Sequence, residues 1–107
     1  EAVANIAEIL SSPNLDGVMI GPYDMSGSLG VPGETTHPLV QEAEKTVITA
    51  CKSAGKSCGT QLADFSEENI GKAIAKGYTF IIASSDLFVL NSWAEEAEKL
   101  VKKYSND

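Results

Sequence analysis

The residues best suited to chemistry in this sequence form one short turn, Gly21, Pro22, Tyr23 and Asp24. The turn directly follows an apolar run from Gly17 to Ile20, which is typical of a short strand buried on both faces. The glycine and the proline make the chain change direction, so Tyr23 and Asp24 are expected at the end of that strand. The carboxylate of Asp24 suits a hard divalent cation, and the backbone N–H groups of Tyr23 and Asp24 can hold an anion.

Two further segments place polar residues at the ends of predicted strands, Gln61 to Asp64 and Ser84 to Asp86. In parallel α/β folds the loops after the strands share one rim, so we expect all three segments to face one pocket. Asp86 is expected to cap a helix rather than bind a metal, and Asp64 is expected to be solvated. His37, the only histidine, stands at a helix entrance, where we expect a capping or packing role.

The spacing of apolar residues predicts alternating helices and strands in the order αβαβαβα, with a loop over 21–37. Strands that alternate with helices pair in parallel through right-handed crossovers, and strands as apolar as these imply cover on both faces. The sequence therefore predicts an α/β fold with three parallel strands. The predicted helices run from Ala2 to Leu10, from Pro38 to a stop at Gly55, from a cap at Ser66 to Gly77, and from Asp86 to Tyr104, and the predicted strands cover 17–20, 57–62 and 79–83.

Three strands make a small sheet with two unpaired edges, which is an awkward stand-alone unit for strands this apolar. The chain also begins directly in a predicted helix, with no strand before it from which to cross over. We therefore expect these 107 residues to be part of a longer barrel.

The charge composition excludes several classes of partner. The net charge is -7, and all eight positive residues are lysines. An acidic chain does not follow a nucleic-acid backbone, and the lack of arginine removes the usual bidentate clamp for a carboxylate. No apolar run approaches the roughly 20 residues of a spanning helix, so we expect no membrane association and a cytoplasmic location. Cys51 and Cys58 lack the spacing of a zinc site and are expected to be buried free thiols.

The segment from Asp16 to Ser26, DGVMIGPYDMS, resembles the DGVFIGPADLS stretch of the HpcH/HpaI aldolases. The likeness continues at Ala54-Gly55-Lys56 and at Ser85-Asp86-Leu87, which resemble the AGK turn and the final GSDLGLL segment of that family. A GPxD turn alone would be a weak signal, but the ordered set is specific. The resemblance implies that residues 1–107 are the C-terminal segment of a single (β/α)8-barrel aldolase domain, which needs about 250 residues.

The resemblance also implies a class II aldolase, which cleaves 4-hydroxy-2-oxo acids to pyruvate and an aldehyde through a metal-stabilised pyruvate enolate. Asp24 corresponds to the family's aspartate ligand for Mg²⁺, Mn²⁺ or Co²⁺. The N–H groups at Tyr23 and Asp24 correspond to those that bind the pyruvate carboxylate. Gln61, a further substrate-binding candidate, departs from the family, because it stands near the position where an apolar residue lines the acceptor pocket. The partner glutamate, which is not Glu1, and the proton-transfer residues are expected upstream, so no catalytic residue is expected within this chain.

Tyr23 departs from the family, which usually has a small residue at this position. Its ring is expected either to narrow the entrance of the pocket or to pack on a neighbouring subunit. The family exchanges its C-terminal helix between subunits, so the resemblance also implies a homo-oligomer. The isolated chain is expected to be inactive.

The positions of the lysines independently favour metal chemistry over an imine mechanism. A Schiff-base lysine would be expected at the end of a strand, whereas all the lysines fall on predicted helices or in the turns after them. Two other functions stay open: an inactive fragment or interaction module that uses the apolar last helix, and a receiver-like domain phosphorylated on Asp24. The second lacks the expected acidic pair and strand-end lysine.

Overall fold

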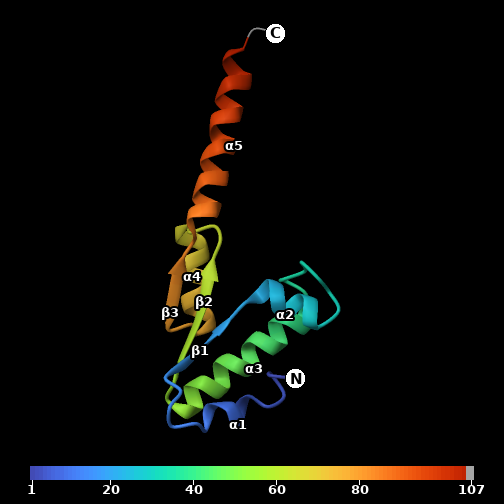
Figure 1. The fold of residues 1–107 in the computed structure, drawn as a ribbon, viewed down its shortest axis with the longest axis vertical. Coiled ribbons are helices and arrows are strands. Elements are labelled where there is room, and N and C mark those ends of the chain that lie inside the picture. The colour runs from blue at the N-terminus through green and yellow to red at the C-terminus, as the bar shows by residue number, and fades with distance from the viewer. Residues whose placement is uncertain (106–107) are drawn as a thin grey trace.

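The computed structural model describes residues 1–105, which form a three-stranded parallel sheet with helices packed on it (Figure 1). The predicted α/β class with three parallel strands is confirmed. The strands lie in the order β1-β2-β3, and each is paired with its neighbour in parallel. The elements in chain order are α1 (Ile6–Leu10), β1 (Gly17–Ile20), α2 (Pro22–Ser28), α3 (Pro38–Ala54), β2 (Ser57–Leu62), α4 (Glu67–Lys76), β3 (Phe80–Ala83) and α5 (Asp86–Tyr104).

One face of the sheet is covered by helices. Alternate residues of a strand point to opposite faces, and on this face Ile20 and Cys58 are buried under α1, α3 and α4. Burying these side chains is the main favourable term for the fold of this chain. The core is formed by Ile6, Leu10, Ile20, Val47, Ile48, Cys51, Cys58, Ala73 and Tyr78.

The opposite face of the sheet carries apolar residues that nothing in residues 1–105 covers. The strand register aligns Met19, Gly59 and Phe80 in one row across the sheet, with Ile82 on the same face of β3. Met19 is 53% exposed, and Phe80 and Ile82 are exposed as well. The expectation of cover on both faces is therefore wrong for this chain. Helices on one side of a parallel sheet form the wall of a barrel, whereas a doubly wound sheet has helices on both sides.

Most helix ends follow the signals in the sequence. Pro38 occupies the first turn of α3, and Gly55 and Gly77 take the left-handed conformation that ends α3 and α4, with φ of 66° and 105°. Ser66 caps α4 through its side chain, which accepts a hydrogen bond from the N–H of Asn69.

Two elements differ from the prediction. Helix α1 begins at Ile6 rather than Ala2, because the preceding residues form turns. Residues 22–28, predicted as loop, form the short helix α2. Pro22 has its φ already set for a first helical turn, and the N–H of Met25 donates to the carbonyl of Gly21 at 2.9 Å. A seven-residue helix rich in glycine and serine has too little apolar periodicity to be recognised in advance.

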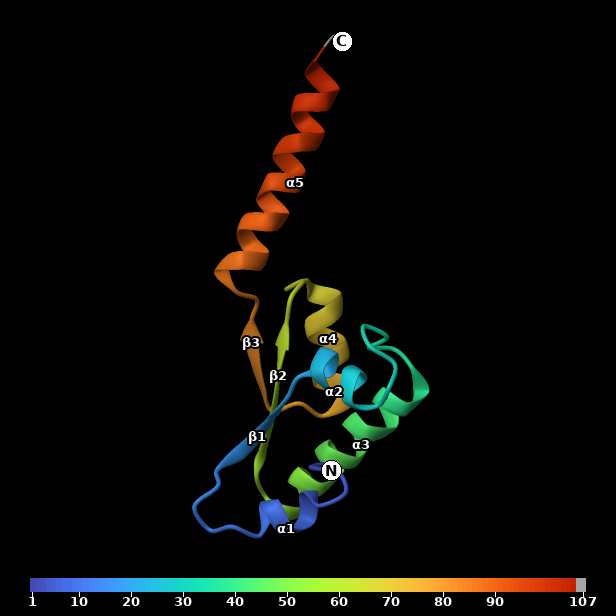
Figure 2. The same ribbon diagram turned by 45° about the vertical axis from the view of Figure 1, so that its right-hand side comes forward.

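Helix α5 extends away from the rest of the molecule (Figures 1 and 2) and gives it principal extents of 62 × 26 × 22 Å. None of its 19 residues is buried. Among the described residues no helix combines the length and the apolar character needed to cross a membrane.

The packing of Phe80 on Gly59, on the uncovered face of the sheet, can be tested by substitution. A Cβ atom at this position would lie 2.0 Å from the ring of Phe80, whereas one at Gly71, in the middle of α4, would meet open space. Gly59→Ala should therefore lower the free energy of unfolding by about 1 kcal/mol, because the Phe80 ring must move. Gly71→Ala should raise it by roughly 0.5 to 1 kcal/mol, because alanine favours helix.

Urea unfolding of both variants at one fixed protein concentration checks this prediction. Changes of the same sign in the two variants would contradict the packing of Phe80 on Gly59.

Candidate functional site

The ends of β1 and β2 and the first turn of α5 line a pocket of about 310 Å³, here called the rim pocket. It brings together the three residues singled out in the sequence, Tyr23, Asp24 and Gln61. The third predicted segment, Ser84 to Asp86, does not line it, and Phe88 of α5 does so instead. The sequence pattern does not identify Phe88 as a pocket residue, because its position depends on how the chain turns from β3 into α5. The other lining residues are Met19, Ile20, Gly21, Pro22, Thr35 and Ala63.

Asp24 lies in the first turn of α2 with an exposed carboxylate. The carboxylate folds back toward Gly21, where a Cβ atom would stand 3.0 Å from Oδ2. Gly21 therefore leaves space for the carboxylate at the pocket edge. Asp24 takes part in none of the salt bridges formed among residues 1–105, so its charge is available to a ligand.

The N-terminus of α2 presents two backbone donors beside this carboxylate. The first hydrogen bond of the helix runs from the N–H of Met25 to the carbonyl of Gly21, and Pro22 has no N–H. The N–H groups of Tyr23 and Asp24 precede that bond and have no partner within the helix. Buried Ser26 holds this turn by donating to the carbonyl of Tyr23 at 2.6 Å. The geometry suits a carboxylate bound at the N–H groups next to a cation held by Asp24.

Gln61 connects the ends of two strands. Its Nε2 donates to the carbonyl of Ser84 at 3.0 Å, and the Ser84 hydroxyl donates to the carbonyl of Ala63 at 2.8 Å. Ser84 has a φ of 61° and is the one non-glycine residue with positive φ among residues 1–105. This conformation is costly outside glycine, and the two hydrogen bonds hold it in place. Gln61 thus orients the turn that carries Phe88 to the pocket.

The metal ligands available in this chain are few. No group of three or more histidine, cysteine, aspartate or glutamate residues suited to a metal occurs within residues 1–105. Mg²⁺ is nevertheless commonly held by one or two carboxylates, with water and substrate oxygens completing its shell. Asp24 fits the role of one such ligand.

The family pattern described as HpcH/HpaI aldolase/citrate lyase matches residues 1–92. This chain belongs to the HpcH/HpaI aldolase/citrate lyase family. It is 36% identical over 95 residues to the 4-hydroxy-2-oxo-heptane-1,7-dioate aldolase of Salmonella arizonae, covering 89% of this chain and 35% of that protein. The protein of the same name from Shigella flexneri is 34% identical over 106 residues, covering 99% of this chain and 38% of the relative. The chain therefore spans little more than a third of these relatives.

Solved structures show the same fold. The HpcH/HpaI aldolase of Desulfitobacterium hafniense superposes with a TM-score of 0.88 at 30% identity, over 98% of this chain and 40% of that one. The HpcH/HpaI aldolase/citrate lyase family protein of Burkholderia cenocepacia gives 0.84 at 30% identity, over 94% and 38%. The three-stranded sheet with helices on one face thus matches part of the barrel fold of these HpcH/HpaI proteins.

Four other sequence-based expectations concern residues outside the rim pocket. Asp64 is exposed as expected, and Nδ1 of His37 caps α3 by accepting from the N–H of Leu39 at 3.2 Å. Cys51 and Cys58 are buried free thiols as expected. The prediction that Asp86 is the cap of α5 is wrong by one residue, because the capping position is Ser85 and Asp86 begins the helix.

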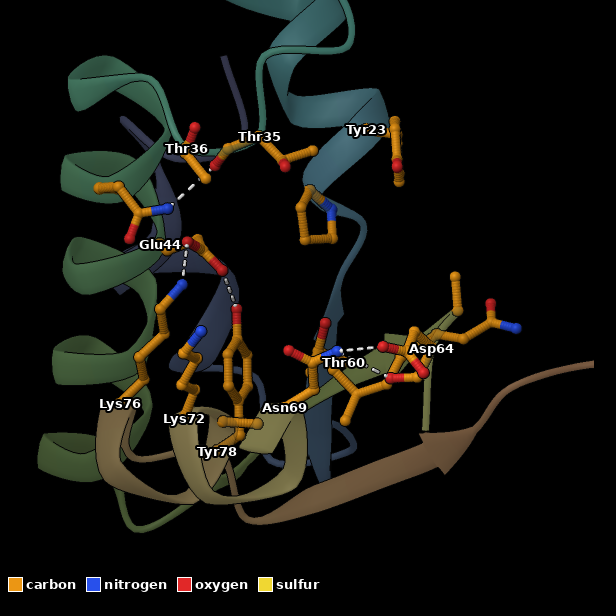
Figure 3. A pocket seen from close by; sticks show the side chains of 16 residues that line it. Tyr23, Thr35, Thr36, Glu44, Thr60, Asp64, Asn69, Lys72, Lys76 and Tyr78 are labelled. Carbon is orange, nitrogen blue, oxygen red and sulfur yellow. Dashed lines mark hydrogen bonds and ion pairs between the residues drawn. The ribbon is translucent and has the colours of Figure 1, made fainter. Parts of the chain in front are cut away.

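A second pocket, of about 350 Å³, lies between α3, α4 and the turn that carries Tyr23 (Figure 3). Glu44 on its wall is only 3% exposed, and its carboxylate accepts from the hydroxyl of Tyr78 at 2.5 Å and from Nζ of Lys76 at 2.9 Å. Sequence reasoning missed this buried acid, although a signal was present. Glu44 lies four residues after Val40 and three before Val47, within the apolar stripe of α3.

Burial and the Glu44 carboxylate together raise the pKa of Tyr78 well above its ordinary value. Burial, reinforced by the neighbouring Cys51, raises the pKa of Cys58 from 9.0 to about 12. The unfolded chain loses these protons at lower pH than the folded chain does. Their contribution to stability is therefore complete below about pH 9 and is lost as the pH rises toward 12.

The raised pKa values of Tyr78 and Cys58 predict that the stability of the folded chain depends on pH. The urea midpoint of unfolding should fall between pH 9 and pH 11, and it should fall less steeply in Tyr78→Phe and Cys58→Ala, each of which lacks one of the titrating groups. Equilibrium unfolding at several pH values measures the slopes. Identical slopes for the wild type and both variants would show that these groups do not titrate differently on folding.

Proposed function

We propose that this chain is the C-terminal part of a metal-dependent class II aldolase that cleaves a 4-hydroxy-2-oxo acid to pyruvate and an aldehyde. The observation that carries the proposal is the rim pocket, where the carboxylate of Asp24 and two free backbone N–H groups lie together at the end of a parallel strand. The family assignment and the names of the curated relatives support the reaction class. Residues 1–107 are proposed as one segment of a single barrel domain.

Each group in the pocket has a proposed part in the reaction. Asp24 holds a divalent cation, Mg²⁺, Mn²⁺ or Co²⁺, which supplies Lewis-acid stabilisation of the negative charge on the 2-oxo group. The N–H groups of Tyr23 and Asp24 bind the carboxylate of the oxo acid, since this segment has no arginine to clamp it. Tyr23, which is 67% exposed, lines the rim pocket together with Phe88 and Gln61, and these three residues are proposed to receive the aldehyde. The second carboxylate ligand and the proton-transfer groups are proposed to come from the rest of the barrel.

Asp24→Asn tests the metal site most directly. The variant is made in a completed barrel, in which this chain is joined to the part of the Shigella flexneri relative that precedes its matched region. Loss of the carboxylate should weaken metal binding and lower kcat/KM for pyruvate release by about 100-fold or more, because the charge that forms in the transition state loses its stabilisation.

Asp64→Asn is the matched control, since Asp64 is an exposed aspartate at the end of the neighbouring strand, outside the rim pocket. It should leave metal affinity and turnover unchanged. An Asp24→Asn enzyme with normal metal affinity and normal activity would refute the assignment.

The carboxylate site makes a separate structural prediction. In a crystal of the completed barrel with pyruvate, the carboxylate oxygens should lie roughly 2.7 to 3.2 Å from the N–H nitrogens of Tyr23 and Asp24. Pyruvate bound elsewhere on the barrel would rule out this part of the proposal.

The alternative function is an inactive fragment or an oligomerisation module of the same fold, and helix α5 favours it. Its large apolar side chains are all exposed, so we propose that α5 packs on a second copy of the protein. Light scattering measures the mass of the assembly. Assembly or folding that depends on a partner, without any metal affinity, would favour the module over the aldolase. The exposed apolar residues of α5 are Leu87, Phe88, Val89, Leu90, Trp93, Leu100, Val101 and Tyr104.

A further inference from the structure

The turn between β3 and α5 contains a residue in a conformation that its type does not favour. Ser84 has a φ of 61°, and every other residue with positive φ among residues 1–105 is a glycine. The Cβ atom of a residue other than glycine is crowded in this region, so the conformation persists only where the surrounding structure holds it. Strained residues of this kind concentrate at functional sites. Ser84 is hydrogen-bonded to Gln61 and Ala63, two residues that line the rim pocket.

Hydrogen bonds from the neighbouring strand hold the Ser84 turn. Nε2 of Gln61 donates to the carbonyl of Ser84 at 3.0 Å, and the Ser84 hydroxyl donates to the carbonyl of Ala63 at 2.8 Å. The N–H of Ser84 donates locally, to the carbonyl of Ile82 at 3.0 Å. The bond from Gln61 joins the Ser84 backbone to a different strand, so its loss would leave the strained residue freer to relax.

The carbonyl that Gln61 holds leads directly into α5. The Ser84 carbonyl and the Ser85 N–H belong to one planar peptide unit, and Ser85 is the capping residue of α5. The carbonyl of Ser85 accepts the hydrogen bond from the N–H of Val89 at 3.0 Å, and Phe88 lies within this first turn. None of the 19 residues of α5 is buried within residues 1–105, so packing in this chain does little to fix the direction of the helix.

Phe88 brings a second aromatic side chain to a small pocket. It lines the rim pocket together with Tyr23 of α2, and both residues are exposed. The volume of about 310 Å³ lies near the lower limit of the roughly 300 to 1,000 Å³ typical of ligand pockets. A ring at the wall of so small a pocket takes space that a bulky substrate group would need. The position of Phe88 therefore bears on the size of the aldehyde.

We propose that Gln61 is a positioning residue that holds the strained Ser84 turn and thereby keeps Phe88 at the rim pocket, where the Phe88 ring restricts the enzyme to small aldehydes. This inference rests on the proposed function, in which the rim pocket receives the aldehyde. Gln61 lines the pocket as well, but its effect on selectivity acts through Ser84 and Phe88.

The test compares two substrates in the completed barrel, 4-hydroxy-2-oxopentanoate, which releases acetaldehyde, and 4-hydroxy-2-oxo-4-phenylbutanoate, which releases benzaldehyde. The ratio of their kcat/KM values measures the selectivity. Phe88→Ala should shift this ratio toward the phenyl substrate by about tenfold, because the space of the ring becomes available. Gln61→Leu removes the amide donor and should shift the ratio in the same direction by about fivefold.

Phe65→Ala is the matched control for the loss of an aromatic ring. Phe65 is an exposed phenylalanine in the connection after β2, outside the rim pocket. The substitution should leave the ratio unchanged. A shift as large as that of Phe88→Ala would show that the selectivity is not set by Phe88, and would overturn the inference.

Ser84→Gly distinguishes positioning by Gln61 from direct contact with the aldehyde. Glycine adopts a positive φ without strain, so Ser84→Gly alone should keep the wild-type ratio. In this background Gln61→Leu should shift the ratio by less than about twofold, because no strained residue is left to relax. If Gln61 acted by touching the aldehyde, its substitution would have the same effect in both backgrounds. Equal shifts would therefore overturn the positioning role.

A crystal structure of the Gln61→Leu barrel gives a readout that does not depend on activity. Ser84 should leave the positive-φ region, and Phe88 should withdraw from the rim pocket. An unchanged Ser84 φ with Phe88 in place would overturn the inference. Normal pyruvate release with an unchanged ratio in Gln61→Leu or Phe88→Ala would overturn it as well, and the proposed function would stand. A completed barrel that releases no pyruvate from either substrate would refute the proposed function, and this inference would fail with it.

Discussion

Parallel pairing of the three strands is the constraint on which the rest of this structure depends. It requires a crossover between successive strands, and each crossover here contains a helix packed on the same face of the sheet. It also places all the carboxyl ends of the strands along one edge. The turn after β1 and the residues after β2 therefore meet at the rim pocket, although they are about forty positions apart in the sequence.

Because the helices pack on one side of the sheet, the other side is left uncovered by residues 1–105. Met19, Phe80 and Ile82 face away from the helices, as residues of a barrel interior do. The proposed site is incomplete in the same way, since Asp24 is a single carboxylate at the edge of the sheet. In the proposed enzyme, the remaining strands of the barrel would complete both the sheet and the site.

Periodicity and end signals allowed most of the fold to be predicted. The strands are short apolar runs, and Pro38, Gly55 and Gly77 mark helix ends through backbone effects that are local in sequence. Asp24 and Tyr23 could be singled out for a related reason, because a turn after a parallel strand lies at the rim in any fold of this class.

The features that escaped prediction depend on contacts between distant segments. Phe88 reaches the rim pocket after a turn in which Ser84 has a positive φ and its carbonyl accepts a hydrogen bond from Gln61. Glu44 is buried because Tyr78 and Lys76, more than thirty residues later, supply its hydrogen bonds. A charged residue within an apolar stripe shows that something unusual happens there, but the partner is visible only in the folded chain.

We propose that this chain is one wall of a barrel and that its site is complete only with the remaining strands. The most direct measurement compares pyruvate release from a 4-hydroxy-2-oxo acid, with Mg²⁺, Mn²⁺ or Co²⁺, by the purified 107-residue chain and by the same chain mixed with the N-terminal segment of the Shigella flexneri relative. The chain alone should associate or aggregate through its uncovered apolar surfaces and should show no turnover. The mixture should gain metal-dependent activity. A monodisperse monomer of this chain that releases pyruvate by itself in the presence of metal would contradict the account.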